Sequence, residues 1–212
     1  DIDFDALIAN ETDSTLKDMH EYFRDRTPTE KNQYTGMFQG KNLLLFTGEA
    51  FWIGAVNEQY TPTLYKLAHS GFVFENFYNP LWYYSTVDGE YAATTGLIPT
   101  NQVNASQRYA GKNGVSMYFS MGNQLRALGY PTLAYHNNTA NYYDRNLSHP
   151  NLGYDFYACD TGLDVAMTWP QSDLEMMQLA GYRVEKMTAV DQFCETVHVE
   201  VVCCLHLSLI HI

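Results

Sequence analysis

The sequence predicts an α/β fold built on a mainly parallel sheet. Short apolar runs alternate along the chain with segments of helical spacing, and this alternation is typical of βαβ units. The clearest run, at residues 41–46, ends in Leu-Leu-Leu-Phe, as expected of a strand buried on both faces. With 212 residues, of which 46% are hydrophobic, the chain can bury a core of ordinary size.

The segment in front of this run, residues 1–40, is predicted to be a helical linker. Apolar side chains recur at helical spacing over residues 5–26, and Thr15-x-x-Asp18 resembles a capping box. Residues 27–40 contain proline and glycine without such spacing, and they are predicted to form a connector.

Turn residues delimit two helices and a strand in the next part of the chain. Thr61-Pro62 places an N-cap and a proline where a helix begins, and Gly71 ends it. Residues 72–78 are expected to form a second strand. A helix is expected from about Thr86 to Thr95, because Gly96 follows.

The second half continues the alternation. Residues 100–114 are polar and predict a loop, whereas residues 119–128 predict a helix that Gly129 ends. Residues 132–135 predict a third strand, and Ser172-x-x-Glu175 is expected to cap a last short helix.

After Met177 the alternation stops. The chain ends in Leu-Ser-Leu-Ile-His-Ile, which a common sequencing adaptor encodes when it is translated. We therefore expect residues 179–212 to be foreign to the natural protein, through frameshift or adaptor read-through. The alternative is a genuine terminal strand rich in β-branched residues.

Charge and cysteine content exclude several classes of protein. The net charge of −12, without a cluster of Lys or Arg, argues against nucleic-acid binding and against a polybasic membrane-docking patch. The four cysteines have neither zinc-site spacing nor a recognisable disulfide framework. No run approaches the roughly 20 apolar residues that span a bilayer. Because the chain opens on Asp1 and shows no signal peptide, we expect it to begin within a longer protein.

Three polar residues stand where a parallel sheet binds ligands, at the carboxyl ends of its strands. Glu49 follows the 41–46 run, and a carboxylate there can bind a hard divalent cation. Thr86 falls in the first turn of its helix, where the helix dipole favours anions. His136 follows the third strand. The simpler alternatives are a solvated loop acid, a plain helix cap and a surface histidine.

A fourth group lies just beyond His136. Tyr143 and Arg145 follow within ten residues, and an arginine and a histidine beside aromatic rings suit a phosphate attached to a small polar group. Taken singly, each of these residues is more often a surface hydrogen-bonding residue.

The order of short motifs along residues 5–178 resembles the extracellular domain of lipoteichoic acid synthases, in the sulfatase-like branch of the alkaline phosphatase superfamily. The motifs are Glu-Ala-Phe (49–51), Thr-Pro-x-Leu-x-x-Leu (61–67), Phe-x-Asn-Phe-Tyr (74–78), Thr-Val-Asp-Gly-Glu-Tyr (86–91), Leu-x-x-Leu-Gly-Tyr (125–130), Tyr-His-Asn-Asn (135–138), Tyr-Asp-Arg (143–145), Leu-Gly-Tyr-Asp (152–155) and Trp169.

This resemblance implies a three-layer α/β/α fold, with residues 41–178 as the N-terminal part of a catalytic domain. It implies that Glu49 and Thr86 bind a divalent metal, Mn²⁺ or Mg²⁺, and that Thr86 is the nucleophile. It further implies that His136 and Arg145 hold glycerol phosphate, beside a ring at Tyr143 where relatives have Trp. The family's other metal ligands, an Asp-His pair, have no counterpart in this sequence, so we expect the chain as it stands to be inactive.

The reaction implied for the longer protein is transfer of glycerophosphate from phosphatidylglycerol to a growing polymer through a threonine nucleophile. The implied place is the extracellular face of the membrane of a Gram-positive-type bacterium, with a transmembrane anchor preceding this sequence. The alternatives are a sulfatase- or phosphodiesterase-type hydrolase and a non-catalytic binding relative. Sulfatases use a Cys or Ser in a Cys/Ser-x-Pro-x-Arg motif, which Thr86-Val87-Asp88-Gly89 does not resemble.

Overall fold

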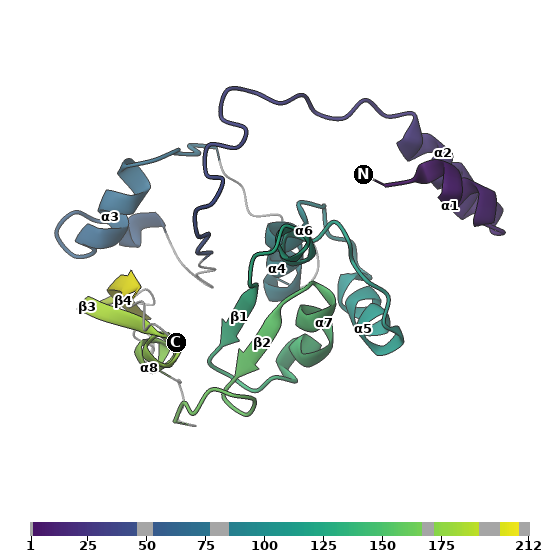
Figure 1. Cartoon of the computed structure of the whole chain (residues 1–212). Coiled ribbons are helices and arrows are strands. Elements are labelled where there is room, and N and C mark those ends of the chain that lie inside the picture. The colour runs from purple at the N-terminus through teal and green to yellow at the C-terminus, as the bar shows by residue number, and fades with distance from the viewer. Residues whose placement is uncertain (1, 46–52, 77–84, 167–171, 191–199, 208–212) are drawn as a thin grey trace. The chain divides into compact units, whose positions relative to one another are not determined.

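The computed structural model describes residues 2–45, 53–76, 85–166, 172–190 and 200–207 (Figure 1). The chain divides into two units, Asp1–Phe46 and Thr47–Ile212. None of the helices in these described ranges is long and apolar enough to span a membrane.

The first unit contains two helices where the sequence predicts one. Helix α1 spans Phe4–Asn10 and α2 spans Ser14–Arg24, and the two helices contact each other. Asp13 caps α2, because its Oδ1 accepts the backbone N–H groups of Thr15 at 2.8 Å and Leu16 at 3.0 Å. The predicted capping box at Thr15 is therefore wrong, since the N-cap is Asp13, two residues earlier, and its carboxylate accepts the free amides of the first turn.

Two of the predicted strands are not strands in the part of the chain that the structure describes. Residues 41–45 have no regular structure, and Leu43 is 63% exposed. Residues 72–74 also lack regular structure, and Phe74 is 76% exposed, while residues 46, 77 and 78 lie outside the described ranges. A parallel strand exists only through hydrogen bonds to its neighbours, and no described strand pairs with either segment.

Four predicted helices are present in the second unit. They are α3 (Pro62–His69), α4 (Ser85–Thr95), α6 (Met121–Ala127) and α8 (Asp173–Leu179). Ser172 caps α8 as expected, since its Oγ accepts the backbone N–H of Glu175 at 3.2 Å. A short 3-10 helix, Ile53–Ala55, precedes α3, and the buried Thr61 hydroxyl donates to its last carbonyl, on Ala55, at 2.6 Å.

The predicted loop at 100–114 contains a helix instead. Helix α5 spans Val103–Asn113 and ends at Gly114, which adopts the left-handed conformation. It packs on α7 (Arg145–Asn151) so closely that a Cβ at Gly111 would lie 2.5 Å from the carbonyl oxygen of Leu147. Contact with α7, rather than an apolar stripe of its own, stabilises this polar helix.

A parallel strand pair forms the centre of the second unit. Strands β1 (Leu133–His136) and β2 (Asp155–Ala158) lie side by side, in register from Leu133 opposite Asp155 to His136 opposite Ala158, and α7 connects them and contacts β2 (Figure 1). This β1–α7–β2 crossover confirms the predicted α/β class. The sequence analysis located β1 and missed β2.

The segment predicted to be foreign carries a second strand pair. Strands β3 (Tyr182–Val190) and β4 (Glu200–Leu207) pair antiparallel. Their valines explain the strand conformation, because β-branched residues favour it. The origin of residues 179–212 stays a prediction.

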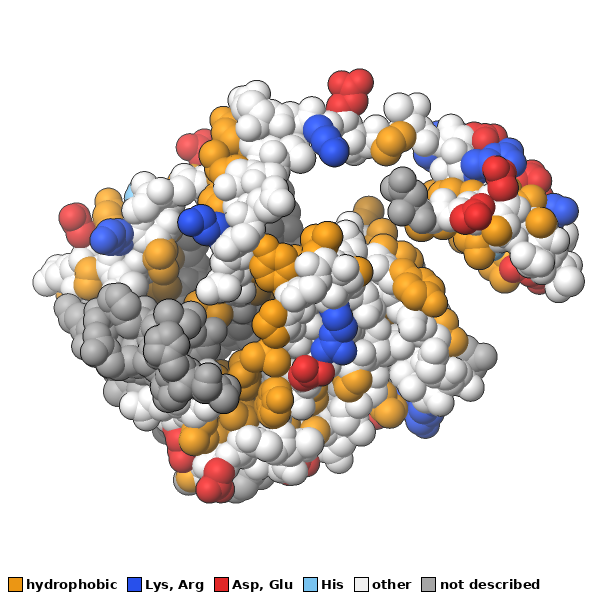
Figure 2. Space-filling view, viewed as in Figure 1, with side chains coloured by type: hydrophobic (Ala, Val, Ile, Leu, Met, Phe, Trp, Pro, Cys, Tyr) orange, Lys and Arg blue, Asp and Glu red, His pale blue; other side chains and the backbone are white. Residues whose placement is uncertain are grey.

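Apolar side chains are prominent at the surface of the second unit (Figure 2). The exposed fractions are 74% for Ile98, 78% for Tyr118 and 74% for Leu128.

Candidate active site

The structure places four of the five predicted site residues. Thr86 lies in the first turn of α4, and His136 is the last residue of β1. Tyr143 lies in a single turn of 3-10 helix, η2 (Tyr142–Asp144), and Arg145 begins α7. Glu49 lies outside the described ranges, so the expectation that it binds a metal together with Thr86 stays a prediction.

His136 stands at the carboxyl end of β1, as the sequence predicts. Its Nδ1 accepts the backbone N–H of Asn138 at 3.2 Å, which leaves the proton of the neutral ring on Nε2. Burial, together with the positive charge of Arg145, lowers the pKa of His136 from 6.5 to about 4. At neutral pH the ring is therefore uncharged and can donate an N–H to a ligand oxygen.

The turn after β1 brings aromatic rings together around His136. Tyr143 and Asp144 both adopt the left-handed conformation, with φ of 57° and 56°, which side chains other than glycine rarely adopt. The ring of Tyr142 stacks on His136 with centroids 6.3 Å apart and meets the ring of Tyr143 edge-on at 4.6 Å. The left-handed turn at Tyr143 and Asp144 thus accompanies the grouping of the Tyr142 and Tyr143 rings beside His136, at the end of β1.

Arg145 lies beneath these rings. Its guanidinium carbon is 5.7 Å from the centroid of the Tyr142 ring and 5.4 Å from that of Tyr143, so both faces can contribute cation–π attraction. Its side chain is only 3% exposed. A charge buried to this degree requires a partner of opposite sign.

That partner is Glu90 on α4. The Nε of Arg145 donates to Oε1 of Glu90 at 2.9 Å, and Nη2 donates to the same oxygen. Nη1 donates to the backbone carbonyl of Tyr142 at 3.1 Å. Together with Tyr143 and His136, the pair Glu90–Arg145 forms what we call the His-Tyr-Arg cluster.

Helix α4 connects this cluster to Thr86. Glu90 lies four residues after Thr86, so both side chains project from the same face of the helix, about 6 Å apart along its axis. Thr86 also lies among the first backbone N–H groups of an 11-residue helix, which favour a negatively charged group. The predicted nucleophile and the predicted phosphate-binding residues therefore belong to one connected set.

Glu90 was not among the residues predicted for the site. Carboxylates are common near the start of a helix, so an acidic residue there does not stand out in the sequence. The spacing of one helical turn from Thr86 was the signal that could have singled it out.

A second histidine close to the cluster belongs to the core. His149 of α7 packs against Phe156, with ring centroids 4.7 Å apart, and against Tyr154 at 6.3 Å. Burial, with the charge of Arg145, lowers the pKa of His149 to about 3. It is a neutral packing residue rather than an acid or base.

The described residues alone do not make up a metal site. In the ranges that the structure covers, no three side chains of His, Cys, Asp or Glu converge as ligands. Of the two ligands that the resemblance implies, only Thr86 falls within these ranges. The groups that the geometry does supply are a hydroxyl, an uncharged imidazole N–H, a guanidinium and two phenol rings.

Comparison with known proteins agrees with the resemblance seen in the sequence. A family model described as Sulfatase matches residues 41–195. Over 153 residues the chain is 26% identical to Lipoteichoic acid synthase 2 of Bacillus subtilis (strain 168), and the aligned region covers 67% of this chain and 22% of that protein. The chain thus spans about a fifth of the length of this relative. No solved structure matches it.

Proposed function

Since this chain belongs to the sulfatase family, whose model matches residues 41–195, we propose that it carries the nucleophile of a sulfatase-like phosphotransferase. The proposed reaction moves glycerophosphate from phosphatidylglycerol to a growing polymer. The observation that carries the proposal is the arrangement on α4, where Thr86 stands one turn before Glu90 and Glu90 holds Arg145.

In the first step, the hydroxyl oxygen of Thr86 attacks the phosphorus of phosphatidylglycerol. A bond forms between this oxygen and phosphorus, and the bond from phosphorus to the diacylglycerol oxygen breaks. Diacylglycerol leaves with the proton, and glycerophosphoryl-Thr86 remains. In the second step, a glycerol hydroxyl at the end of the polymer attacks the same phosphorus. The bond from phosphorus to the Thr86 oxygen breaks, and the proton of the glycerol hydroxyl passes to Thr86.

The other residues of the cluster serve to bind and orient. Nε2–H of His136 donates to a phosphoryl oxygen, and the guanidinium of Arg145 balances negative charge that grows in the transition state. The ring of Tyr143 packs against the glycerol carbons. Because His136 is uncharged at neutral pH, it orients the phosphate without competing with Arg145 for charge.

Enzymes of this family generally depend on a divalent metal. We propose Mn²⁺ or Mg²⁺, with Glu49 and Thr86 among its ligands. The described residues do not complete such a site. The two steps above therefore involve only side chains of this chain, and none is assigned to the metal.

The setting of the reaction is also part of the proposal. The similarity to the Bacillus protein, a lipoteichoic acid synthase, supports a lipid donor and a glycerophosphate polymer as acceptor. It supports an extracellular site at the membrane of a Gram-positive-type bacterium, with an anchor in a longer protein. On this proposal, the 212-residue chain by itself is inactive, because the remaining metal ligands belong to that longer protein.

A hydrolase is the second candidate, and the family match itself favours it. In that case water, rather than a glycerol hydroxyl, attacks glycerophosphoryl-Thr86, and free glycerol phosphate is the product. The two candidates differ only in the second step. Product analysis separates them, because a transferase extends the polymer and a hydrolase does not.

The test uses the full-length protein that contains this sequence, with phosphatidylglycerol vesicles and Mn²⁺. Thr86→Ala should abolish diacylglycerol release, because it removes the attacking atom. Thr95→Ala is the matched control, since Thr95 lies at the far end of the same helix, where its hydroxyl donates to the carbonyl of Tyr91 and accepts the backbone N–H of Leu97. Normal diacylglycerol release by Thr86→Ala would refute the assignment and direct attention to Ser85.

A further inference from the structure

We infer that Glu90 is a positioning residue, which holds Arg145 in place for the phosphate of the substrate. This inference rests on the proposed function, because it assigns a role within the same site. The observation behind it is the double hydrogen bond from Arg145 to one oxygen of Glu90.

The burial of the pair gives Glu90 its importance. The side chain of Arg145 is 3% exposed and that of Glu90 is 23% exposed. Solvent therefore cannot hydrate the guanidinium of Arg145 in place of its ion pair with Glu90. Loss of the carboxylate would leave a buried cation, which must then move toward solvent or bind another anion.

The hydrogen bonds also leave donors for a ligand. A guanidinium has five N–H groups, and the bonds to Glu90 and to the carbonyl of Tyr142 use three of them. Within the described part of the chain, the remaining two N–H groups, one on Nη1 and one on Nη2, have no acceptor. Because the other hydrogen of each of these nitrogens is held by a hydrogen bond, the two N–H groups point in fixed directions, as recognition of a phosphate requires.

A second ion pair fixes the residue before Arg145. Nε of Arg108 on α5 donates to Oδ2 of Asp144 at 2.8 Å, and Nη2 donates to the same oxygen. Asp144 and Arg145 are thus held by different helices, α5 and α4. This arrangement stabilises the left-handed turn at Tyr143 and Asp144.

The position of Glu90 on α4 distinguishes a functional role from a merely structural one. A structural ion pair could join α7 to any helix, but this one joins it to the helix that carries Thr86, one turn away. The same carboxylate therefore sets the distance between the nucleophile and the guanidinium. We expect its loss to affect substrate binding and turnover more than folding.

The experiment compares Glu90→Gln, Glu90→Asp and Arg145→Gln in the full-length protein with phosphatidylglycerol vesicles. Glu90→Gln should lower kcat/KM roughly tenfold or more, as loss of a charged hydrogen bond does. Glu90→Asp should recover part of this loss, because it restores the charge. Glu90→Gln combined with Arg145→Gln should be no worse than Arg145→Gln alone, since Glu90 acts through Arg145.

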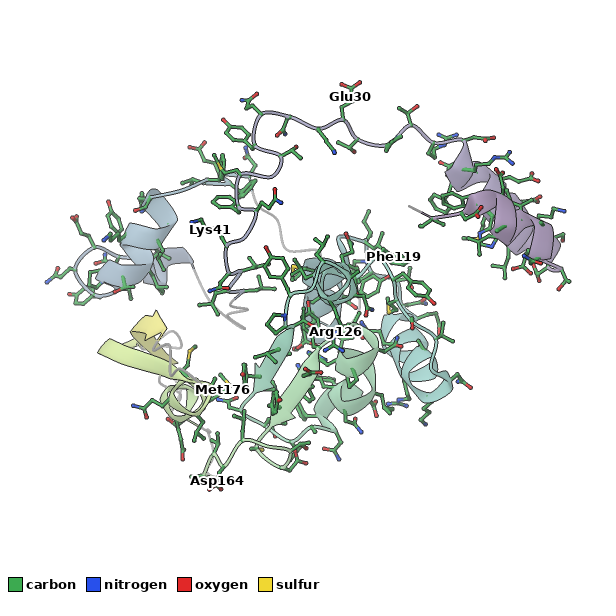
Figure 3. The ribbon with its side chains drawn as sticks, in the orientation of Figure 1. Glu30, Lys41, Phe119, Arg126, Asp164 and Met176 are labelled. Carbon is green, nitrogen blue, oxygen red and sulfur yellow. The ribbon has the colours of Figure 1, made fainter. Side chains whose placement is uncertain are left out.

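The matched control removes another ion pair of the second unit. Arg126 of α6, labelled in Figure 3, donates to Asp155 at the start of β2 at 2.7 Å, and both side chains are about half exposed, at 47% and 57%. Arg126→Gln should leave kcat/KM within about twofold of the wild type. If Glu90→Gln behaves like Arg126→Gln, or if the losses in the double variant multiply, the inference is overturned.

A binding assay separates this inference from the proposed function. If the wild-type protein transfers no glycerophosphate, the proposed function fails. Calorimetric titration with glycerol 1-phosphate still tests the positioning role, and Glu90→Gln should weaken this binding roughly tenfold. Equal affinity of wild type and variant, or no binding by the wild type, would overturn the inference.

Discussion

The half-buried ring of His136 makes stability depend on pH. The pKa of His136 falls from 6.5 to about 4 on folding, and each pKa unit corresponds to about 1.4 kcal/mol. Because the unfolded chain binds the proton more tightly, stability is fully present above pH 6.5 and declines as the pH falls toward 4. Protonation of this ring should therefore cost the folded state roughly 3 kcal/mol, a large share of the 5–15 kcal/mol typical of domains.

The assay is urea unfolding of the wild type and His136→Gln at pH values from 7 to 4. Since glutamine does not titrate, the difference between the two proteins isolates the ring from other groups, including His149, whose pKa is lowered to about 3. The stability difference should shift by roughly 3 kcal/mol in favour of the variant as the pH falls. A difference that stays constant over this range would refute the reasoning, as would an NMR titration that places the pKa of His136 near 6.5.

Four further results are expected. Ser120→Ala should lower the free energy of unfolding by about 2–4 kcal/mol, measured by urea denaturation, because it removes the cap of α6 and leaves the buried carbonyl of Leu152, 2.8 Å away, without its donor. Gly153→Ala should cost about 3 kcal/mol or more, since φ is +92° and a Cβ would lie 2.5 Å from the backbone nitrogen of Asn123. Gly114→Ala, at φ +64° with open space around it, should cost only about 1 kcal/mol, and equal losses at both glycines would contradict this view. Finally, the 212-residue chain alone should release no diacylglycerol from phosphatidylglycerol, and release at the rate of the full-length protein would show that it holds every essential ligand.

Sequence alone predicted the helices that depend on local signals. Proline at the start of α3 and Ser172 before α8 act through neighbouring backbone groups, so they can be recognised without knowledge of the fold. Helix α5 was missed because its stability comes from contact with α7, which the local sequence does not reveal.

Strands were predicted less well, because pairing is not local. The run at 41–45 is more apolar than β2 (Asp155–Ala158), yet only β2 pairs with another described strand. The pairing follows from the α7 crossover, which brings the start of β2 beside the start of β1. Hydrophobicity alone therefore ranked the two segments in the wrong order.

The sequence predicted which types of residue form the candidate site, but not which of these residues form an ion pair with each other. The positions of Thr86 at the start of a helix and of His136 at the end of a strand followed from sequence pattern. The pairing of Glu90 with Arg145 joins residues 55 positions apart, and no local rule relates them. The same holds for the depressed pKa of His136, which results mainly from burial.

The central claim is that Thr86 forms the covalent intermediate. The most direct measurement is peptide mass spectrometry of the full-length protein, quenched during reaction with phosphatidylglycerol and Mn²⁺ without polymer acceptor. We predict a glycerophosphoryl group on the peptide that contains Thr86, and its absence in Thr86→Ala. A modification located on Ser85 or any other residue, or rapid release of diacylglycerol without any adduct, would contradict the account.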